Sequence, residues 1–209
     1  MSLLTTWGYT ITDADALADM LSADAFNALT AGKYAGDVRI SPALSAACMS
    51  VRNYAGWHVY PSQACSFSER LLAGNGRVKR AGPDILIQLP ATFVTGITAV
   101  EIDGSPWTDF ALSSNGMLRL FDMSDRLTRK TEITVAYTAG ISDAMMGALR
   151  ELISSRAVRA LSGTAGVSSE SAGGVSVSYS ASWTGGGGAG ALQSTDLETL
   201  EPYKLREVF

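Results

Sequence analysis

The residues of this sequence that could do acid–base or nucleophilic chemistry are few and far apart. His58 is the only histidine in 209 residues, and it lies between aromatic residues in the stretch Gly-Trp-His-Val-Tyr-Pro, residues 56–61. A Ser–His–Asp or Cys–His arrangement would have to be built around it. Because its sequence neighbours are aromatic, we expect a packed or hydrogen-bonded imidazole, and an enzyme that uses His58 is a remote hypothesis.

The sequence also lacks the spacings that bind phosphates, dinucleotides or metals. Gly185–Gly188 is glycine-rich, but no lysine precedes Gln193-Ser194-Thr195 as a P-loop requires. Gly74-Asn75-Gly76 lacks the third glycine of a dinucleotide-binding turn. One histidine and two cysteines, Cys48 and Cys65, do not make a ligand set for zinc. We therefore predict no catalytic residues, no cofactor, no metal and no enzymatic activity.

The charge of the chain argues against tight binding of nucleic acid. The net charge is −4, and charged residues make up 17% of the chain, against about 25% in an ordinary soluble domain. A protein that binds DNA through its phosphates normally needs a basic face. We interpret the two short basic clusters as solvated loop charge; they contain Arg77, Lys79 and Arg80, and Arg126, Arg129 and Lys130.

The cysteines and the hydropathy of the sequence indicate the cellular compartment of the protein. Two cysteines without CxxC spacing predict free thiols, and Cys48, among Ala and Met, is expected to be buried. No basic and apolar leader opens the chain, and no apolar run approaches the ~20 residues needed to span a bilayer. We expect a protein of the cytoplasm, without a membrane partner, until it joins an assembly.

The elements that must position these residues change in type along the chain. Short helices are expected near the N-terminus, and Ser41-Pro42 opens a helix that runs to about Tyr54. Apolar alternation and the Asp103-Gly104 turn then predict a small antiparallel unit at about residues 85–137. A long helix starts at Ser142-Asp143 and ends at Gly163. We assign residues 1–161 to a helical core with this β insertion.

The last 48 residues have a different composition. Residues 162–190 are rich in Ser, Gly and Ala, with a single charge at Glu170, and predict either a β-hairpin or a linker. In residues 191–209, the stretch Asp196–Leu200 predicts a helical turn before Pro202, and apolar residues follow at Tyr203, Leu205, Val208 and Phe209. We predict that residues 191–209 form an arm that docks on a partner. The alternative is that this arm folds back onto its own core.

The order of several short motifs resembles a known family. These motifs are residues 53–63 (Asn-Tyr-Ala-Gly-Trp-His-Val-Tyr-Pro-Ser-Gln), 100–104 (Val-Glu-Ile-Asp-Gly), 133–140 (Ile-Thr-Val-Ala-Tyr-Thr-Ala-Gly), 166–171 (Gly-Val-Ser-Ser-Glu-Ser), 175–179 (Val-Ser-Val-Ser-Tyr) and 200–206 (Leu-Glu-Pro-Tyr-Lys-Leu-Arg). Together they cover nearly the whole chain. They resemble the head-to-tail adaptor, or head–tail connector, proteins of long-tailed bacteriophages and related gene-transfer particles.

The resemblance implies a fold, a partner and a location. The fold would be α+β: a mainly helical bundle with an inserted small antiparallel β unit and an extended C-terminal arm. The subunits would form a homo-oligomeric ring, commonly of 12 copies, between the portal protein and the stopper or tail-side connector of the virion, after assembly in the host cytoplasm. DNA would pass through the lumen without specific binding. The family's portal contact maps here onto Leu200, Tyr203, Leu205, Arg206 and Phe209.

A second hypothesis comes from a different functional class. A monomeric bacterial binding module could use the β unit to contact a ligand or a cell-surface partner. The oligomeric state and the binding of a portal protein separate the two hypotheses.

Overall fold

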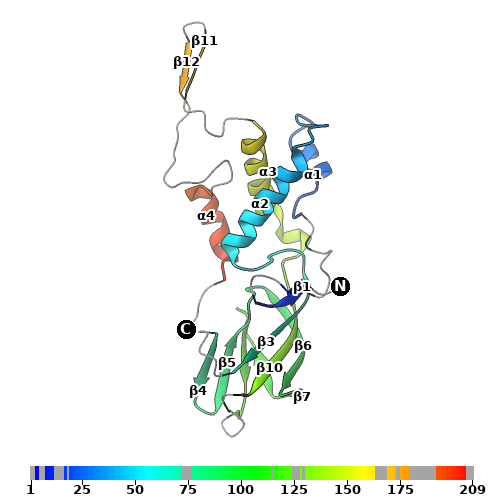
Figure 1. Ribbon diagram of the computed structural model, residues 1–209, viewed down its shortest axis with the longest axis vertical. Coiled ribbons are helices and arrows are strands. Elements are labelled where there is room, and N and C mark those ends of the chain that lie inside the picture. Colours follow the sequence, from blue (N-terminus) through cyan, green and yellow to red (C-terminus); the bar gives the residue numbers. More distant parts are fainter. Residues whose placement is uncertain are drawn as a thin grey trace. The chain divides into compact units, whose positions relative to one another are not determined.

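The chain folds into two compact units, each assembled from separated parts of the sequence (Figure 1). Unit 1 comprises residues 1–18, 52–146 and 201–209, and unit 2 comprises residues 19–51 and 147–200. The structure is a computed structural model. It describes residues 3–4, 8–11, 17, 19–71, 77–113, 115–123, 128, 130–162, 169–172, 175–178 and 192–205.

Unit 1 is built from two antiparallel sheets. The first has the strand order β1-β2-β3-β10-β6-β7, and the second has the order β4-β5-β9-β8. The strands of the first sheet are β1 (Leu3–Leu4), β2 (Thr10–Ile11), β3 (Gln63–Arg70), β10 (Glu132–Ala139), β6 (Val94–Ile102) and β7 (Ser105–Pro106). Those of the second are β4 (Val78–Ala81), β5 (Asp84–Gln88), β9 (Met117–Leu120) and β8 (Phe110–Leu112).

The sequence of β10 shows why the first sheet has one buried face. Ile133, Val135 and Tyr137 alternate with less apolar residues and are fully or almost fully buried, as expected for a strand with one side against a core. Across the ladder Val135 pairs with Phe67 of β3 and with Val100 of β6, and all three are buried. The apolar positions of neighbouring strands therefore meet on the same face.

Gly140 lies immediately after β10, where a side chain would not fit. Its φ of +129° is a conformation that residues with a Cβ rarely adopt. A Cβ there would also collide with the backbone of Pro61 and Ser62. The backbone of the loop before β3 can approach the end of β10 only because this residue is glycine.

We expect Gly140→Ala to lower the free energy of unfolding by about 1–3 kcal/mol, because it adds backbone strain and a clash with another backbone segment. Chemical denaturation measures the change. Gly96→Ala is the matched control, since Gly96 lies in β6 without a positive φ, and a methyl group added there would have nothing within 4 Å. Equal effects of the two substitutions would contradict this account.

Unit 2 is mainly helical in the part that the structure describes. Its helices are α1 (Ala23–Leu29), the first part of α2 (Ile40–Ala55), α3 (Gly147–Leu161) and α4 (Ser194–Leu200). The Ser22 hydroxyl caps α1 by accepting a hydrogen bond from the Ala25 amide at 3.2 Å. Buried apolar side chains from all four helices form its core; they include Phe26, Leu44, Cys48, Leu149, Ile153 and Leu200.

The remaining short elements complete the chain. Asp143–Met145 and Glu201–Tyr203 are single 3-10 turns, labelled η2 and η3. In the Ser/Gly-rich segment, β11 (Ser169–Ala172) pairs antiparallel with β12 (Val175–Ser178). No helix among the described residues is long and apolar enough to cross a membrane.

The prediction of a mainly helical bundle is wrong. The chain is α+β, but β structure is more than a small insertion, because unit 1 carries two sheets and its strands extend well before residue 85. The strand β3 was not predicted from the sequence, because its apolar positions are few and do not alternate clearly: Ala64 is exposed, whereas the polar Gln63 is buried. The individual elements were predicted better: α2 and α3 lie where the sequence predicts helices, within a few residues, and β5, β6, β8, β9 and most of β10 fall in the predicted β unit at about residues 85–137.

Candidate functional site

His58, the only histidine, is part of the core of unit 1. Its side chain is fully buried, and both ring nitrogens are hydrogen-bonded. Nε2 lies 3.0 Å from the carbonyl oxygen of Ala139 and 3.1 Å from that of Pro61. Carbonyl oxygens only accept hydrogen bonds, so Nε2 carries the proton. Nδ1 then accepts from the Tyr9 hydroxyl at 2.7 Å.

This environment keeps the imidazole neutral. Burial, with a smaller contribution from the positive charge of Arg52, lowers the pKa of His58 to about 4, although its two carbonyl partners oppose the shift. The Tyr9 hydroxyl also accepts from the His58 backbone amide at 3.0 Å, so the two residues are joined twice. The expectation of a packed and hydrogen-bonded histidine is confirmed. Its geometry is that of a structural residue that links β10 to the loop before β3.

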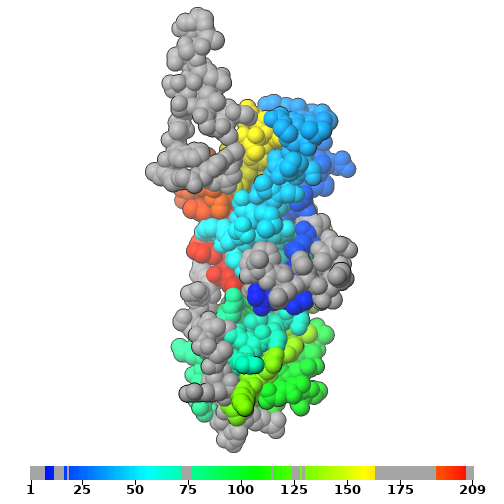
Figure 2. Space-filling model, viewed as in Figure 1, coloured from blue at the N-terminus to red at the C-terminus, as the bar shows by residue number. Residues whose placement is uncertain are grey.

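A different cluster in unit 1 is the stronger candidate for function: the C-terminal anchor, residues 201–205. Its backbone is held at three points by the core. The Trp57 indole donates to the carbonyl oxygen of Tyr203 at 2.6 Å, and the Leu205 amide donates to the carbonyl oxygen of Ala55 at 2.8 Å. The Thr92 hydroxyl lies 3.5 Å from the carbonyl oxygen of Lys204. In Figure 2 red atoms from near the end of the chain lie beside cyan atoms from around residues 50–60.

Aromatic and polar side chains add to this attachment. The ring of Phe93 lies between those of Trp57 and Tyr203, with centroid distances of 6.1 Å and 5.9 Å, within the range of favourable aromatic contacts. At the start of the segment the Tyr54 hydroxyl donates to the Glu201 carboxylate at 2.9 Å. The ammonium group of Lys204 lies over the Tyr54 ring, 5.4 Å from its centroid. The anchor is therefore specified by both backbone and side-chain contacts.

We expect Trp57→Phe to loosen the anchor without unfolding unit 1. The substitution keeps an aromatic ring but removes the hydrogen bond to Tyr203, which contributes about 1 kcal/mol, and it leaves a small cavity because Trp57 is fully buried. Hydrogen exchange at the Leu205 amide should become several-fold faster. Trp107→Phe is the control, since it removes an indole hydrogen bond to Asp109 on another part of unit 1. If Leu205 exchanges at the wild-type rate in Trp57→Phe, the indole does not hold the segment.

The five residues proposed to contact a portal lie in different environments. Leu200 is fully buried in unit 2, at the end of α4. Tyr203 and Leu205 are half-buried in the anchor of unit 1. Arg206 and Phe209 lie outside the described residues. From Leu200 to Leu205, therefore, the segment packs on its own chain, as in the alternative in which the arm folds back.

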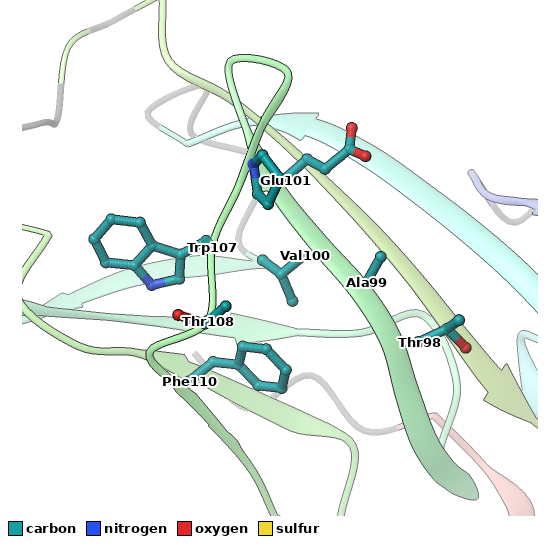
Figure 3. Close-up of a pocket in the computed structure, with 8 residues that line it drawn as sticks. Thr98, Ala99, Val100, Glu101, Trp107, Thr108 and Phe110 are labelled. Carbon is teal, nitrogen blue, oxygen red and sulfur yellow. The ribbon is translucent and has the colours of Figure 1, made fainter.

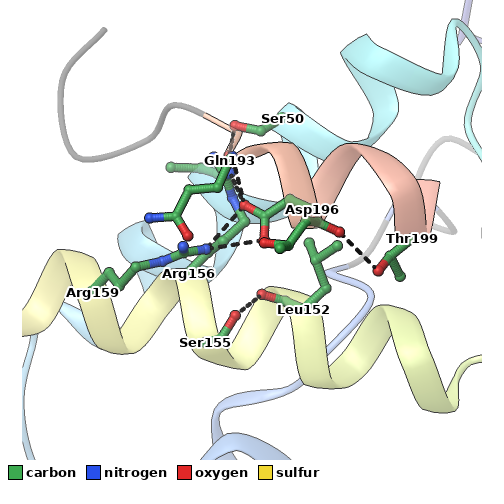
Figure 4. A network of polar contacts seen from close by, with 10 residues as sticks. Ser50, Leu152, Ser155, Arg156, Arg159, Gln193, Asp196 and Thr199 are labelled. Atoms are coloured by element: carbon green, nitrogen blue, oxygen red, sulfur yellow. Dashed lines mark hydrogen bonds and ion pairs between the residues drawn. The ribbon is translucent and has the colours of Figure 1, made fainter. Parts of the chain in front are cut away.

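The helix that precedes the anchor is held in unit 2 by a buried ion pair (Figure 4). The Asp196 carboxylate lies 3.3 Å from Nη1 of Arg156 and 3.0 Å from Nη2 of Arg159, both on α3. It also accepts from the Gln193 amide at 3.0 Å, which satisfies a free donor at the start of α4. Burial lowers the pKa of Arg156, and the Asp196 charge opposes this shift.

A third feature is an open depression on unit 1 (Figure 3). It has a volume of about 450 Å³ and lies where β6, β7 and β8 meet. Its lining is mostly apolar, with Val100, Trp107 and Phe110 around the floor and Glu101 at the rim. Trp107 and Phe110 are each half-buried, so their rings remain accessible to a partner.

Comparison with known proteins adds no assignment: no family model matches the chain, and no curated protein matches it. Among the described residues, no group of three or more His, Cys, Asp or Glu side chains is arranged to hold a metal ion.

The sequence reading missed most of the residues that make these sites. In the sequence Trp57 stands beside His58 and within the motif at residues 53–63, whereas Thr92 and Phe93 belong to no motif. Asp196 was assigned to a helical turn, but its arginine partners are 40 and 37 residues away in the sequence. The single available signal was the stretch of aromatic residues from Tyr54 to Tyr60, which is typical of a packing centre.

Proposed function

We propose that the chain is a structural head–tail connector, or adaptor, subunit. In this role 12 copies form a ring under the portal of a phage virion, extend the DNA channel and provide the docking platform for the stopper or tail. The observation that carries the proposal is the C-terminal anchor. It fixes the backbone at Leu205 through the Ala55 carbonyl, which gives every subunit the same attachment point next to the proposed portal contact.

The anchor also refines which residues contact the portal in this proposal. Leu200 and Tyr203 act within the chain, because one is buried and the other is held by Trp57 and Phe93. The portal contact then falls to Leu205, Arg206 and Phe209. A short contact of this kind gains strength from repetition, since each tail after the first binds at a high effective concentration.

Two further properties support a channel role. The net charge of −4 disfavours retention of DNA phosphates in a lumen. The only histidine is fully buried with both nitrogens occupied, so it fits a structural role better than a catalytic one.

Co-expression with the portal protein of the same phage tests the proposal. We expect a co-complex that electron microscopy resolves as a ring of 12 copies on the portal. A chain lacking residues 206–209 retains the anchor and should fold normally but lose portal binding. Equal binding by the truncated chain would disprove the assignment of the portal contact, and failure of the intact chain to bind would disprove the connector function.

The second candidate is a monomeric bacterial ligand- or surface-binding module. The depression at Trp107 favours it, because its volume falls within the range of about 300–1,000 Å³ that is typical of small-molecule sites. A chain that stays monomeric, does not bind the portal and tolerates loss of residues 206–209 would favour this candidate.

A further inference from the structure

Unit 1 has an acidic edge, which we define as Glu101, Asp103 and Asp109 around the β6, β7 and β8 strands. All three carboxylates are exposed. Asp103 accepts a hydrogen bond from the Glu132 amide, and none of the three forms an ion pair within the described part of the chain. Glu101 lines the depression at Trp107, and Asp109 lies in the chain between its lining residues Thr108 and Phe110, so this edge combines negative charge with accessible apolar surface.

Unit 1 also has a basic edge, formed by Lys79 and Arg80 on β4. Both side chains are exposed, and β4 pairs with β5 alone. The turn that follows brings exposed apolar atoms from Ala81 and Pro83 next to these charges. The basic edge therefore has the same two components as the acidic edge, with the opposite sign of charge.

The two edges face in different directions. In the second sheet, β4 and β8 are the two outermost strands, with β5 and β9 between them. The depression joins β8 to β6 and Pro106 of β7, which places the acidic edge on the β8 side. Figure 1 shows β4 and β7 on opposite sides of unit 1. One copy therefore cannot join its own two edges.

We infer that copies of this chain associate head to tail, with the basic edge of one copy on the acidic edge of the next. Contact between two different surfaces of the same chain propagates, and it closes into a ring when the rotation between copies permits. Opposite charges at the rim orient the subunits, and apolar contact at the Trp107 depression supplies the dry centre. That the contact closes into a ring, rather than an open chain of copies, rests on the proposed connector function.

Side chains, rather than a continuous sheet between copies, make this contact. β6 has two register shifts where it pairs with β10, and β7 contains Pro106. Irregular strands and proline at a sheet edge disfavour the addition of another strand. The specificity of the contact therefore lies in charge and in the fit to the depression.

Charge reversal tests the contact with the full chain alone. The first variant is Lys79→Glu with Arg80→Glu, and the second is Glu101→Lys with Asp109→Lys. Sedimentation and native mass spectrometry at low salt, up to about 1 mM subunit, measure association. We expect wild-type association that weakens with salt, and each variant alone should lose about tenfold or more in association constant.

Mixing the two variants is the decisive measurement. Their reversed edges are complementary, so an equimolar mixture should associate to within a few-fold of wild type. Glu151→Lys with Glu198→Lys is the matched control, because it changes the net charge by the same amount as the second variant, at exposed positions of unit 2. The control should associate like wild type.

Three results would overturn the inference: a wild-type chain that stays monomeric throughout, single variants that associate like wild type or no worse than the control, and a mixture that is not restored. None of these measurements uses the portal. Head-to-tail association without portal binding would support this interface and disprove the connector function. Portal binding without head-to-tail association would support the connector function and disprove this interface.

Discussion

Replacing Asp196 with alanine is expected to lower the free energy of unfolding of unit 2 by about 3–5 kcal/mol, the cost of removing one member of a buried ion pair. Arg156 is 3% exposed, and its guanidinium lies 3.3 Å from the Asp196 carboxylate. Without that carboxylate the charge of Arg156 stays buried, and burial already lowers the pKa of this guanidinium. The loss should be measurable by urea denaturation as a lower midpoint with an unchanged slope.

Loss of Asp196 should also loosen α4 and the anchor that follows it. α4 is seven residues long, too short to be stable without tertiary contacts. The ion pair attaches α4 to α3, and Leu200 at the end of α4 is fully buried. Since the anchor follows α4 directly in the chain, release of α4 should also speed hydrogen exchange of the residues after Leu200.

Two comparisons isolate the ion pair as the cause. Glu198→Ala removes an exposed carboxylate from the same helix and should change stability by no more than about 0.5 kcal/mol. The double variant Arg156→Met, Asp196→Leu removes both charges and should recover most of the loss, because apolar replacements of a buried pair are often tolerated. A double variant as unstable as Asp196→Ala would mean that the charge is not the cause.

Sequence reasoning predicted the elements whose patterns are local. The helix that begins near Ser41-Pro42 and the turn at Asp103-Gly104 are encoded by adjacent residues, and both are present. The Asp-Gly pair adopts the positive φ angles, 50° and 77°, that a tight hairpin requires. Such features depend on backbone sterics alone, so one sequence suffices to find them.

Elements defined by distant partners were missed. β3 is a strand because β10 and β2 lie on either side of it, and Phe67 pairs with Val135, which is 68 positions later in the sequence. Three of the four residues of β4 are exposed, so Lys79 and Arg80 were interpreted as loop charge although they lie in a strand. Propensity gives little information about an edge strand, whose place is fixed by its neighbour.

The candidate site was predictable only in outline. The sequence indicates that apolar residues near the end of the chain, such as Tyr203 and Leu205, need burial. It does not indicate which surface buries them. Trp57, Thr92 and Phe93 supply that surface, and they come from two segments 35 residues apart in the sequence. The sequence therefore predicts an arm that binds a partner, whereas in the fold residues 201–205 pack on unit 1 of the same chain.

Lowering the pH from 7 to 4 is expected to remove about 3 kcal/mol of stability through His58 alone. The pKa of His58 is about 4 in the folded protein, against 6.5 for an ordinary histidine. Between these values the unfolded chain binds a proton that the folded chain does not, so unfolding is favoured as the pH falls. The contribution is fully present above pH 6.5, decreases through this window and levels off below pH 4.

The physical cause is the hydrogen bonding described for the neutral ring. Protonation of Nδ1 would place a donor opposite the Tyr9 hydroxyl, which now donates to it at 2.7 Å, and would bury a positive charge near Arg52. Tyr9→Phe should therefore raise the pKa of His58, because the neutral ring loses the hydrogen bond from the Tyr9 hydroxyl. The pH range over which His58 lowers the stability should then become narrower. NMR titration of the imidazole carbons reports this pKa directly.

The measurement is the free energy of unfolding from denaturant titrations at pH 7, 5.5 and 4, for wild type and for His58→Gln. Glutamine can still donate and accept but does not titrate, so the difference between the two proteins removes the contribution of carboxylates, including Glu69, whose pKa burial raises. The wild type should lose about 3 kcal/mol more than His58→Gln over the full window. Parallel curves for the two proteins would show that His58 is not protonated on unfolding, and its neutral, buried state would then be disproved.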